Sequence, residues 1–97
     1  MPRGAPRLRT AQEQQNLVGP RVKARRKELV LTQDALCARL ARITEGRWNP
    51  TIFDVYRVES QRRIVSDLEM LALSLALECS LYDLLGVSSQ APTFPAE

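Results

Sequence analysis

The chain has 97 residues, of which 44% are hydrophobic and 26% are charged, a balance typical of one small globular domain. It has no histidine and two cysteines, Cys37 and Cys79, so one chain cannot complete a four-ligand zinc site or use a histidine acid–base catalyst. We therefore expect no metal, no cofactor and no enzymatic activity. Both cysteines stand within apolar patterns, as buried thiols do in a reducing cytoplasm, and no apolar run approaches the roughly 20 residues of a membrane helix.

Charge is distributed unevenly along the sequence. Residues 1–30 carry eight basic residues and two acidic ones, whereas residues 64–97 carry five acidic residues and no basic one. A chain polarised in this way can direct its basic end toward a polyanion such as nucleic acid. A solvated charged surface without any partner explains the same distribution equally well.

The two ends of the chain differ in composition from the middle. Residues 1–15 are rich in proline and arginine and poor in apolar side chains, which predicts a flexible basic arm. Residues 88–97 are predicted to form a short disordered tail, so the domain is expected to cover residues 16–87. Three arginines of the arm could lie along a DNA duplex or simply be solvated: Arg3, Arg7 and Arg9.

The first two helices are indicated by their starting residues. Gly19 and Pro20 mark the start of the first, because proline is tolerated in a first turn. Its C-terminal end carries the cations that suit a helix dipole, namely Arg25, Arg26 and Lys27. The second helix covers residues 33–43, with Thr32 as its N-cap. Its apolar stripe consists of Leu36, Leu40 and Ile43.

The stretch NPTIFDVYRVES, residues 49–60, is rich in β-branched residues, so local propensity alone favours a strand. Its apolar positions do not alternate strictly, and their steps of three and four are typical of a helix. We therefore predict a third helix over residues 51–60, capped by Asn49 or Thr51. Val55 and Val58 are expected in the core.

A fourth helix is predicted after Ser66, which forms a capping-box sequence with Glu69. The run that follows is apolar around most of a helix, which predicts burial on both sides. Its two stripes are Leu68, Leu71, Ala72 and Leu75, and Met70, Leu73 and Leu77. Ser80 is expected to cap a fifth helix, and Gly86 to end it. The predicted fold is thus all-α, with five short helices and no strand.

Several motifs occur in the order and spacing of one known family. They are Val18-Gly19, Val22-Lys23, Arg26, Leu31-Thr32-Gln33, Leu36-Cys37 and Val55-Tyr56-Arg57-Val58-Glu59. Over about 70 residues the chain resembles the phage-repressor/Cro (XRE-type) family of DNA-binding domains, which implies a lambda-repressor-like helix-turn-helix fold. The turn before the third helix is longer than usual, similar to a family variant with a tryptophan there, matched by Trp48. Glu78 stands where the family often has a helix-ending glycine, which predicts backbone strain.

The resemblance implies a set of DNA contacts. Side chains expected to face base edges in the major groove are Ile52, Phe53, Tyr56 and Arg57. Arg57 could pair with guanine or be solvated beside Glu59, and Phe53 could contact thymine methyls or belong to the core. Residues expected to contact phosphates are Gln33, Thr51, Arg62 and Arg63, although the two arginines could also be ordinary surface charge. Asp54 would repel phosphate, yet a carboxylate can accept from cytosine N4.

These features predict a sequence-specific DNA-binding transcriptional regulator, a repressor, that binds double-stranded DNA as a homodimer at the cytoplasmic nucleoid. The apolar residues available for the homodimer interface are Leu73, Leu75, Leu77, Leu81 and Tyr82. The alternative is a protein-interaction module on the same fold, such as an adaptor or an antitoxin-like partner. It is favoured by the apolar, partly acidic character of the surface around Phe53 and Asp54.

Overall fold

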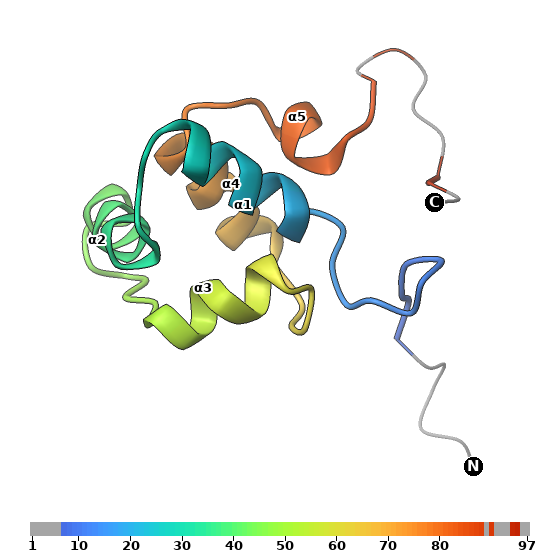
Figure 1. Ribbon diagram of the computed structural model, residues 1–97, viewed down its shortest axis with the longest axis horizontal. Helices are drawn as coiled ribbons and strands as arrows, with labels where there is room; N and C mark the ends of the chain where they lie inside the picture. Colours follow the sequence, from blue (N-terminus) through green and yellow to red (C-terminus); the bar gives the residue numbers. More distant parts are fainter. Residues whose placement is uncertain (1–6, 89, 91–93, 96–97) are drawn as a thin grey trace.

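The computed structural model describes residues 7–88, 90 and 94–95, which form five helices and no strand (Figure 1). The helices are α1 (Gly19–Glu28), α2 (Gln33–Ile43), α3 (Ile52–Glu59), α4 (Asp67–Ala76) and α5 (Leu81–Leu85). The all-α prediction is confirmed for this part of the chain, as are the five helices. The rest of the expected arm and tail, residues 1–6 (with Arg3), 89, 91–93 and 96–97, lies outside the described residues.

Side-chain caps explain where four of the helices begin. Thr32 accepts a hydrogen bond from the backbone N–H of Ala35 at 3.0 Å. The three later helices each begin with a capping box, in which hydroxyl and carboxylate each accept from the other residue's backbone N–H. These boxes are Thr51–Asp54, Ser66–Glu69 and Ser80–Asp83. The predicted caps are confirmed, and of the two candidates for α3 the cap is Thr51.

Four helices end alike, with one residue in the left-handed conformation just after the C-cap. These residues are Val30 (φ 57°), Glu45 (φ 54°), Gln61 (φ 62°) and Glu78 (φ 54°). At each end the following N–H bonds to a carbonyl five residues earlier, as Leu31 does to Arg26 at 3.0 Å, which is the bond of a Schellman motif. A Cβ in this conformation costs about 1–2 kcal/mol. The strain expected at Glu78 is therefore present at three further helix ends, and α5 avoids it with Gly86 (φ 69°).

The core forms where the helices meet. Helix α2 packs against α3 and α4, α1 packs against α3 and α5, and α4 packs against α5. The buried apolar side chains are Val18, Val22, Leu36, Cys37, Leu40, Val55, Val58, Ala72, Leu73, Ala76, Leu77 and Leu84. The prediction that Val55 and Val58 are core residues is confirmed. Trp48, in the long turn between α2 and α3, packs against the core from its edge.

The prediction that α4 is buried on both sides is wrong. One of its stripes is mostly exposed, with Leu68 at 77%, Leu71 at 47% and Leu75 at 55% of full exposure, and only its Ala72, at 5%, is buried. The other stripe includes Leu73 and Leu77, which are only 2% and 0% exposed. Leu73 and Leu77 therefore belong to the core of a single chain. Their assignment to a homodimer interface is corrected, because a side chain without accessible surface cannot contact a second copy.

Residues 10–15 of the expected arm are hydrogen-bonded to one another and to the domain. The Thr10 hydroxyl accepts from the Gln14 N–H at 3.0 Å, and the Glu13 N–H donates to the Thr10 carbonyl at 2.8 Å, which closes a turn. The Gln15 N–H then donates to the carbonyl of Gln61 at 3.1 Å. The segment from Thr10 therefore belongs to the domain, because its backbone is hydrogen-bonded to the loop that follows α3.

Candidate nucleic-acid interface

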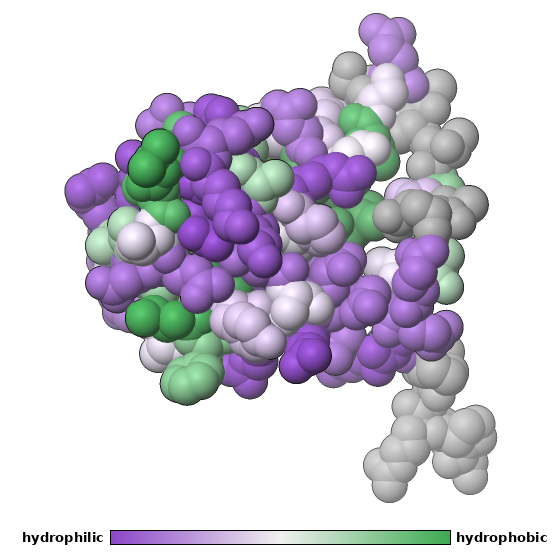
Figure 2. All heavy atoms as spheres, in the orientation of Figure 1, coloured by the Kyte–Doolittle hydropathy of each residue, from purple (hydrophilic) through white to green (hydrophobic). Residues whose placement is uncertain are grey.

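Helix α3 presents four of the predicted contact residues on one outer face. Ile52 is 48% exposed, Phe53 75% and Tyr56 47%, and the Arg57 side chain is 53% exposed. Figure 2 shows hydrophobic atoms at the start of α3, interrupting a mainly hydrophilic surface. The alternative of Phe53 as a core residue is therefore wrong. The outer face of α3 is apolar near its start and carries a cation one turn later.

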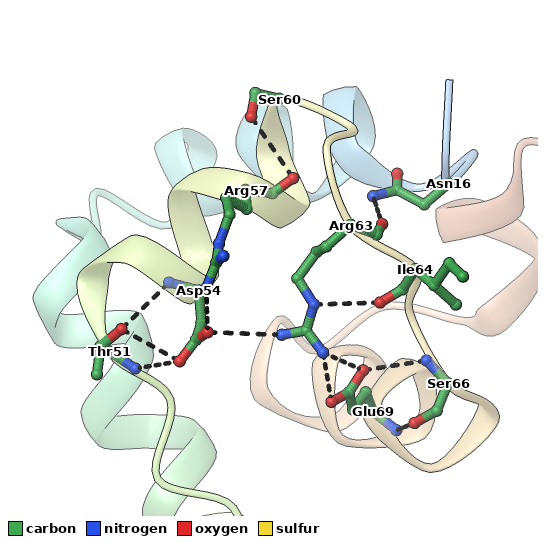
Figure 3. Close-up of polar contacts among 9 residues, drawn as sticks. All are labelled: Asn16, Thr51, Asp54, Arg57, Ser60, Arg63, Ile64, Ser66 and Glu69. Atoms are coloured by element: carbon green, nitrogen blue, oxygen red, sulfur yellow. Dashed lines mark hydrogen bonds and ion pairs between the residues drawn. The ribbon is translucent and has the colours of Figure 1, made fainter. Parts of the chain in front are cut away.

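Asp54 has a structural role at the start of α3. Its carboxylate accepts from the Thr51 backbone N–H at 2.8 Å, and Arg57 donates to its other oxygen at 3.2 Å (Figure 3). The Thr51 backbone hydrogen bond, helped by the Thr51 hydroxyl, Arg57 and the charge of Arg63, lowers the pKa of Asp54. The negative charge of Asp54 is therefore stabilised by groups of the same chain, which weakens the repulsion between Asp54 and a DNA phosphate.

The pair between Arg57 and Asp54 is exposed and links residues three apart on one helix. Pairs of this kind contribute only about 0–1 kcal/mol. The Arg57 guanidinium can therefore leave Asp54 for a base or a phosphate at small cost. The other suggested partner, Glu59, is not available to Arg57, because Glu59 is buried against α1.

Arg62 and Arg63 are neighbours with different surroundings. Arg62 is exposed, and its carbonyl accepts from the Gln15 amide at 3.2 Å. The Arg63 side chain is only 24% exposed, and it donates to both carboxylate oxygens of Glu69 at 2.9 and 2.7 Å (Figure 3). This ion pair fixes the loop to the start of α4 and leaves Arg63 less available to a phosphate than Arg62. Arg62 keeps the exposure that a phosphate contact needs.

A buried ion pair, absent from the sequence-based predictions, lies beneath α3. Arg26 of α1 donates to the two carboxylate oxygens of Glu59 at 2.6 and 3.1 Å, and both residues are less than 9% exposed. Arg26 also donates to the Leu31 carbonyl at 2.7 Å. A signal existed in the sequence: Arg26 follows Val22 by four residues and Glu59 follows Val55 by four, so both charges fall at core positions.

Gln33 joins this network from the start of α2. Its amide nitrogen donates to Glu59 at 3.1 Å, which holds the half-buried side chain against the end of α3. One amide hydrogen remains for an outside acceptor, since a primary amide has two. Glu59 therefore links α1, α2 and α3 and sets the position of Gln33, a predicted phosphate contact.

Asn16 is a second residue that the sequence reading missed. It is 8% exposed, and its amide donates to the carbonyls of Val58 at 3.1 Å and Arg63 at 2.9 Å. Its side-chain oxygen accepts from the Gly19 N–H at 2.9 Å, at the start of α1. Asn16 thus holds the loop that carries Arg62 against α1. No local sequence pattern could predict these contacts, because the residues are far apart in the chain.

The remaining predicted residues are divided between surface and core. Thr51 is exposed beside the start of α3, and Arg7 and Arg9 are exposed in the N-terminal segment. Of the five residues expected at a homodimer interface, Leu75 is 55%, Leu81 38% and Tyr82 49% exposed. These three remain accessible to a second copy, unlike the two buried leucines.

No family model, curated protein or solved structure matches the chain. In the part of the chain that the structure describes, every helix is too short or too polar to cross a membrane.

Proposed function

We propose that the chain is a sequence-specific DNA-binding transcriptional regulator, a repressor that inserts α3 into the major groove. The observation that carries this proposal is the outer face of α3. Four side chains are exposed there, on a helix that the buried ion pair beneath it holds in place: Ile52, Phe53, Tyr56 and Arg57. The resemblance of α2, the long turn and α3 to the helix-turn-helix of the phage-repressor/Cro family supports it, as does the basic N-terminal half.

The contacts follow from the chemistry of each residue. Arg57 pairs with guanine, and Ile52 and Phe53 contact thymine methyls. Arg62 and the free amide hydrogen of Gln33 contact phosphates near the end of α3, which fix its register. A homodimer places two copies of α3 about 34 Å apart, so the operator is a two-fold sequence with half-sites one helical turn apart.

The experiment is selection of bound sequences from a random duplex pool, followed by affinity measurements over a range of salt concentrations. Retention of a defined sequence supports the proposal, with affinity falling by about 0.9 log units per log unit of salt for each neutralised phosphate. Retention of no sequence at moderate salt would contradict it.

Two substitutions separate the proposed roles. Arg57→Ala should reduce discrimination at one base position by about 1–3 kcal/mol. Arg62→Ala should weaken binding to all sequences alike and reduce the salt slope by about 0.9. Arg21→Ala is the matched control, because Arg21 lies against Gly86 beside α5, away from α3. Equal effects of the Arg57 and Arg62 changes would contradict the assignment of roles.

A second candidate function is a protein-interaction module. It is favoured by Phe53, which is 75% exposed beside Ile52 on the outer face of α3. Exposed apolar surface of this kind is typical of protein-interaction sites. If the duplex pool yields no sequence and Phe53→Ala abolishes binding to a co-purifying protein, this function replaces the first.

A further inference from the structure

Three leucines of α4 form an exposed row. Leu68, Leu71 and Leu75 are spaced three and four residues apart, so they lie on one face of the helix, and they are 77%, 47% and 55% exposed. Soluble chains rarely leave such a row uncovered, and contiguous apolar surface of this kind marks an interaction site. We call these three residues the leucine row.

A groove of about 490 Å³ runs beside the leucine row, between α4 and the long turn that follows α2. The turn contributes Trp48 and Arg47, and the end of α2 contributes Ile43. The leucine row supplies the other wall. The exposed leucine row therefore lies directly beside an apolar groove on the same surface.

Two charges border this surface. Arg47 is exposed, its Nε donates to the Thr44 carbonyl at 3.2 Å, and it forms no ion pair with any described residue. Asp67, next to Leu68, is exposed and likewise forms no ion pair within the described ranges. Glu69 also lines the groove, but Arg63 already neutralises it. The surface thus offers one cation and one anion to a partner.

We propose that a second copy of the chain binds this surface through a two-fold axis. The leucine row of each copy enters the groove of the other, and Arg47 of each copy faces Asp67 of the other. A two-fold interface joins a patch to itself, so the patch must be complementary to itself in shape and charge. The patch supplies both halves of each contact: the leucine row with its adjoining groove, and the cation of Arg47 with the anion of Asp67.

The proposed interface and the outer face of α3 lie on different helices. Helix α4 packs on α2 and α5, whereas α3 packs on α1 and α2. The inference rests on the proposed function in one respect only: the homodimer serves to bind a two-fold operator. The association itself is measured without DNA.

The test is sedimentation equilibrium of the full chain, without DNA, over a wide range of protein concentrations. We expect a dimer whose association constant falls by at least ~100-fold in Leu71→Glu and in Leu68→Glu, as for central interface residues. Leu68 is the more exposed of the two, so its variant retains the fold, which circular dichroism checks. Leu81→Glu tests the competing site on α5, where the sequence-based prediction placed part of the interface, and should leave the association unchanged.

A charge exchange tests the ion pairs. Arg47→Glu should weaken the dimer by about tenfold, and the double variant Arg47→Glu/Asp67→Arg should recover it. A monomer at every concentration would overturn the proposal, as would a dimer that Leu81→Glu dissociates and the leucine-row variants do not. Failure of the double variant to recover would overturn the arrangement of the two copies. A chain that dimerises through α4 but selects no DNA refutes the proposed function alone.

Discussion

Removing the charge of Glu59 should cost a large part of the stability of the fold. Glu59→Gln preserves the size of the side chain but leaves the Arg26 guanidinium buried without a counter-ion. The two residues are 8% and 7% exposed, and they are joined by two hydrogen bonds of 2.6 and 3.1 Å. Breaking a buried pair from one side costs about 3–5 kcal/mol. Small domains have only about 5–15 kcal/mol in total.

Urea denaturation followed by circular dichroism measures this loss. A loss of 3–5 kcal/mol lowers the melting temperature of a domain of this size by about 4–8 °C per kcal/mol, so thermal melts provide a second reading. Glu28→Gln is the matched control, because its pair with Arg25 joins side chains that are 66% and 33% exposed, at 3.2 Å. An exposed pair contributes about 0–1 kcal/mol.

Equal losses in Glu59→Gln and Glu28→Gln would refute the reasoning that the buried charge decides the cost. The double variant Arg26→Met/Glu59→Leu adds a second check. It removes both charges together, so it should be much more stable than Glu59→Gln, as apolar replacements of buried pairs are often neutral or stabilising. A double variant less stable than Glu59→Gln would contradict the same reasoning.

Three further predictions concern the backbone and the caps. Gly19→Ala should destabilise the fold by about 1–3 kcal/mol, because the new Cβ would collide with the Val58 carbonyl and lie 2.9 Å from that of Glu59; a neutral result in urea denaturation would contradict this close approach. Val30→Gly should stabilise it, because relief of about 1–2 kcal/mol of left-handed strain exceeds glycine's entropic cost of about 0.5–1 kcal/mol, whereas the control Val30→Ala should not. Asp54→Asn should be less stable than the unmodified chain at neutral pH. Because folding lowers the pKa of Asp54, its contribution is complete above the ordinary value of 3.8 and is lost as the pH falls through the lower folded value, so urea midpoints should converge in acid.

Helix positions could be predicted from the sequence because their signals are local. A cap such as Ser66 and its partner Glu69 stand three residues apart, and the spacing of Val55 and Val58 distinguishes a helix from a strand within one turn. Strain at Glu78 could also be predicted, because the resemblance indicates a helix-ending glycine at that position, whereas the same strain at Val30, Glu45 and Gln61 was not predicted.

What covers each helix could not be predicted in the same way. Periodicity marks Leu68 and Leu73 as equally apolar, yet one is 77% and the other 2% exposed. The difference depends on which neighbours α4 meets, and these come from distant parts of the chain. The surroundings of Arg63 could not be predicted for a similar reason: its charge is evident in the sequence, but its ion pair with Glu69 depends on the path of the loop.

The contacts of Asn16 also have a consequence for how the chain folds as it is synthesised. Asn16 bonds to carbonyls 42 and 47 positions later, and Arg26 pairs with a residue 33 positions later. The first two helices therefore leave the ribosome well before their partners exist, with Val22 and Leu36 still uncovered. Folding completes only after Leu84 of α5 has emerged, because Leu84 belongs to the core. Fragments that stop short of it should therefore be aggregation-prone and readily degraded.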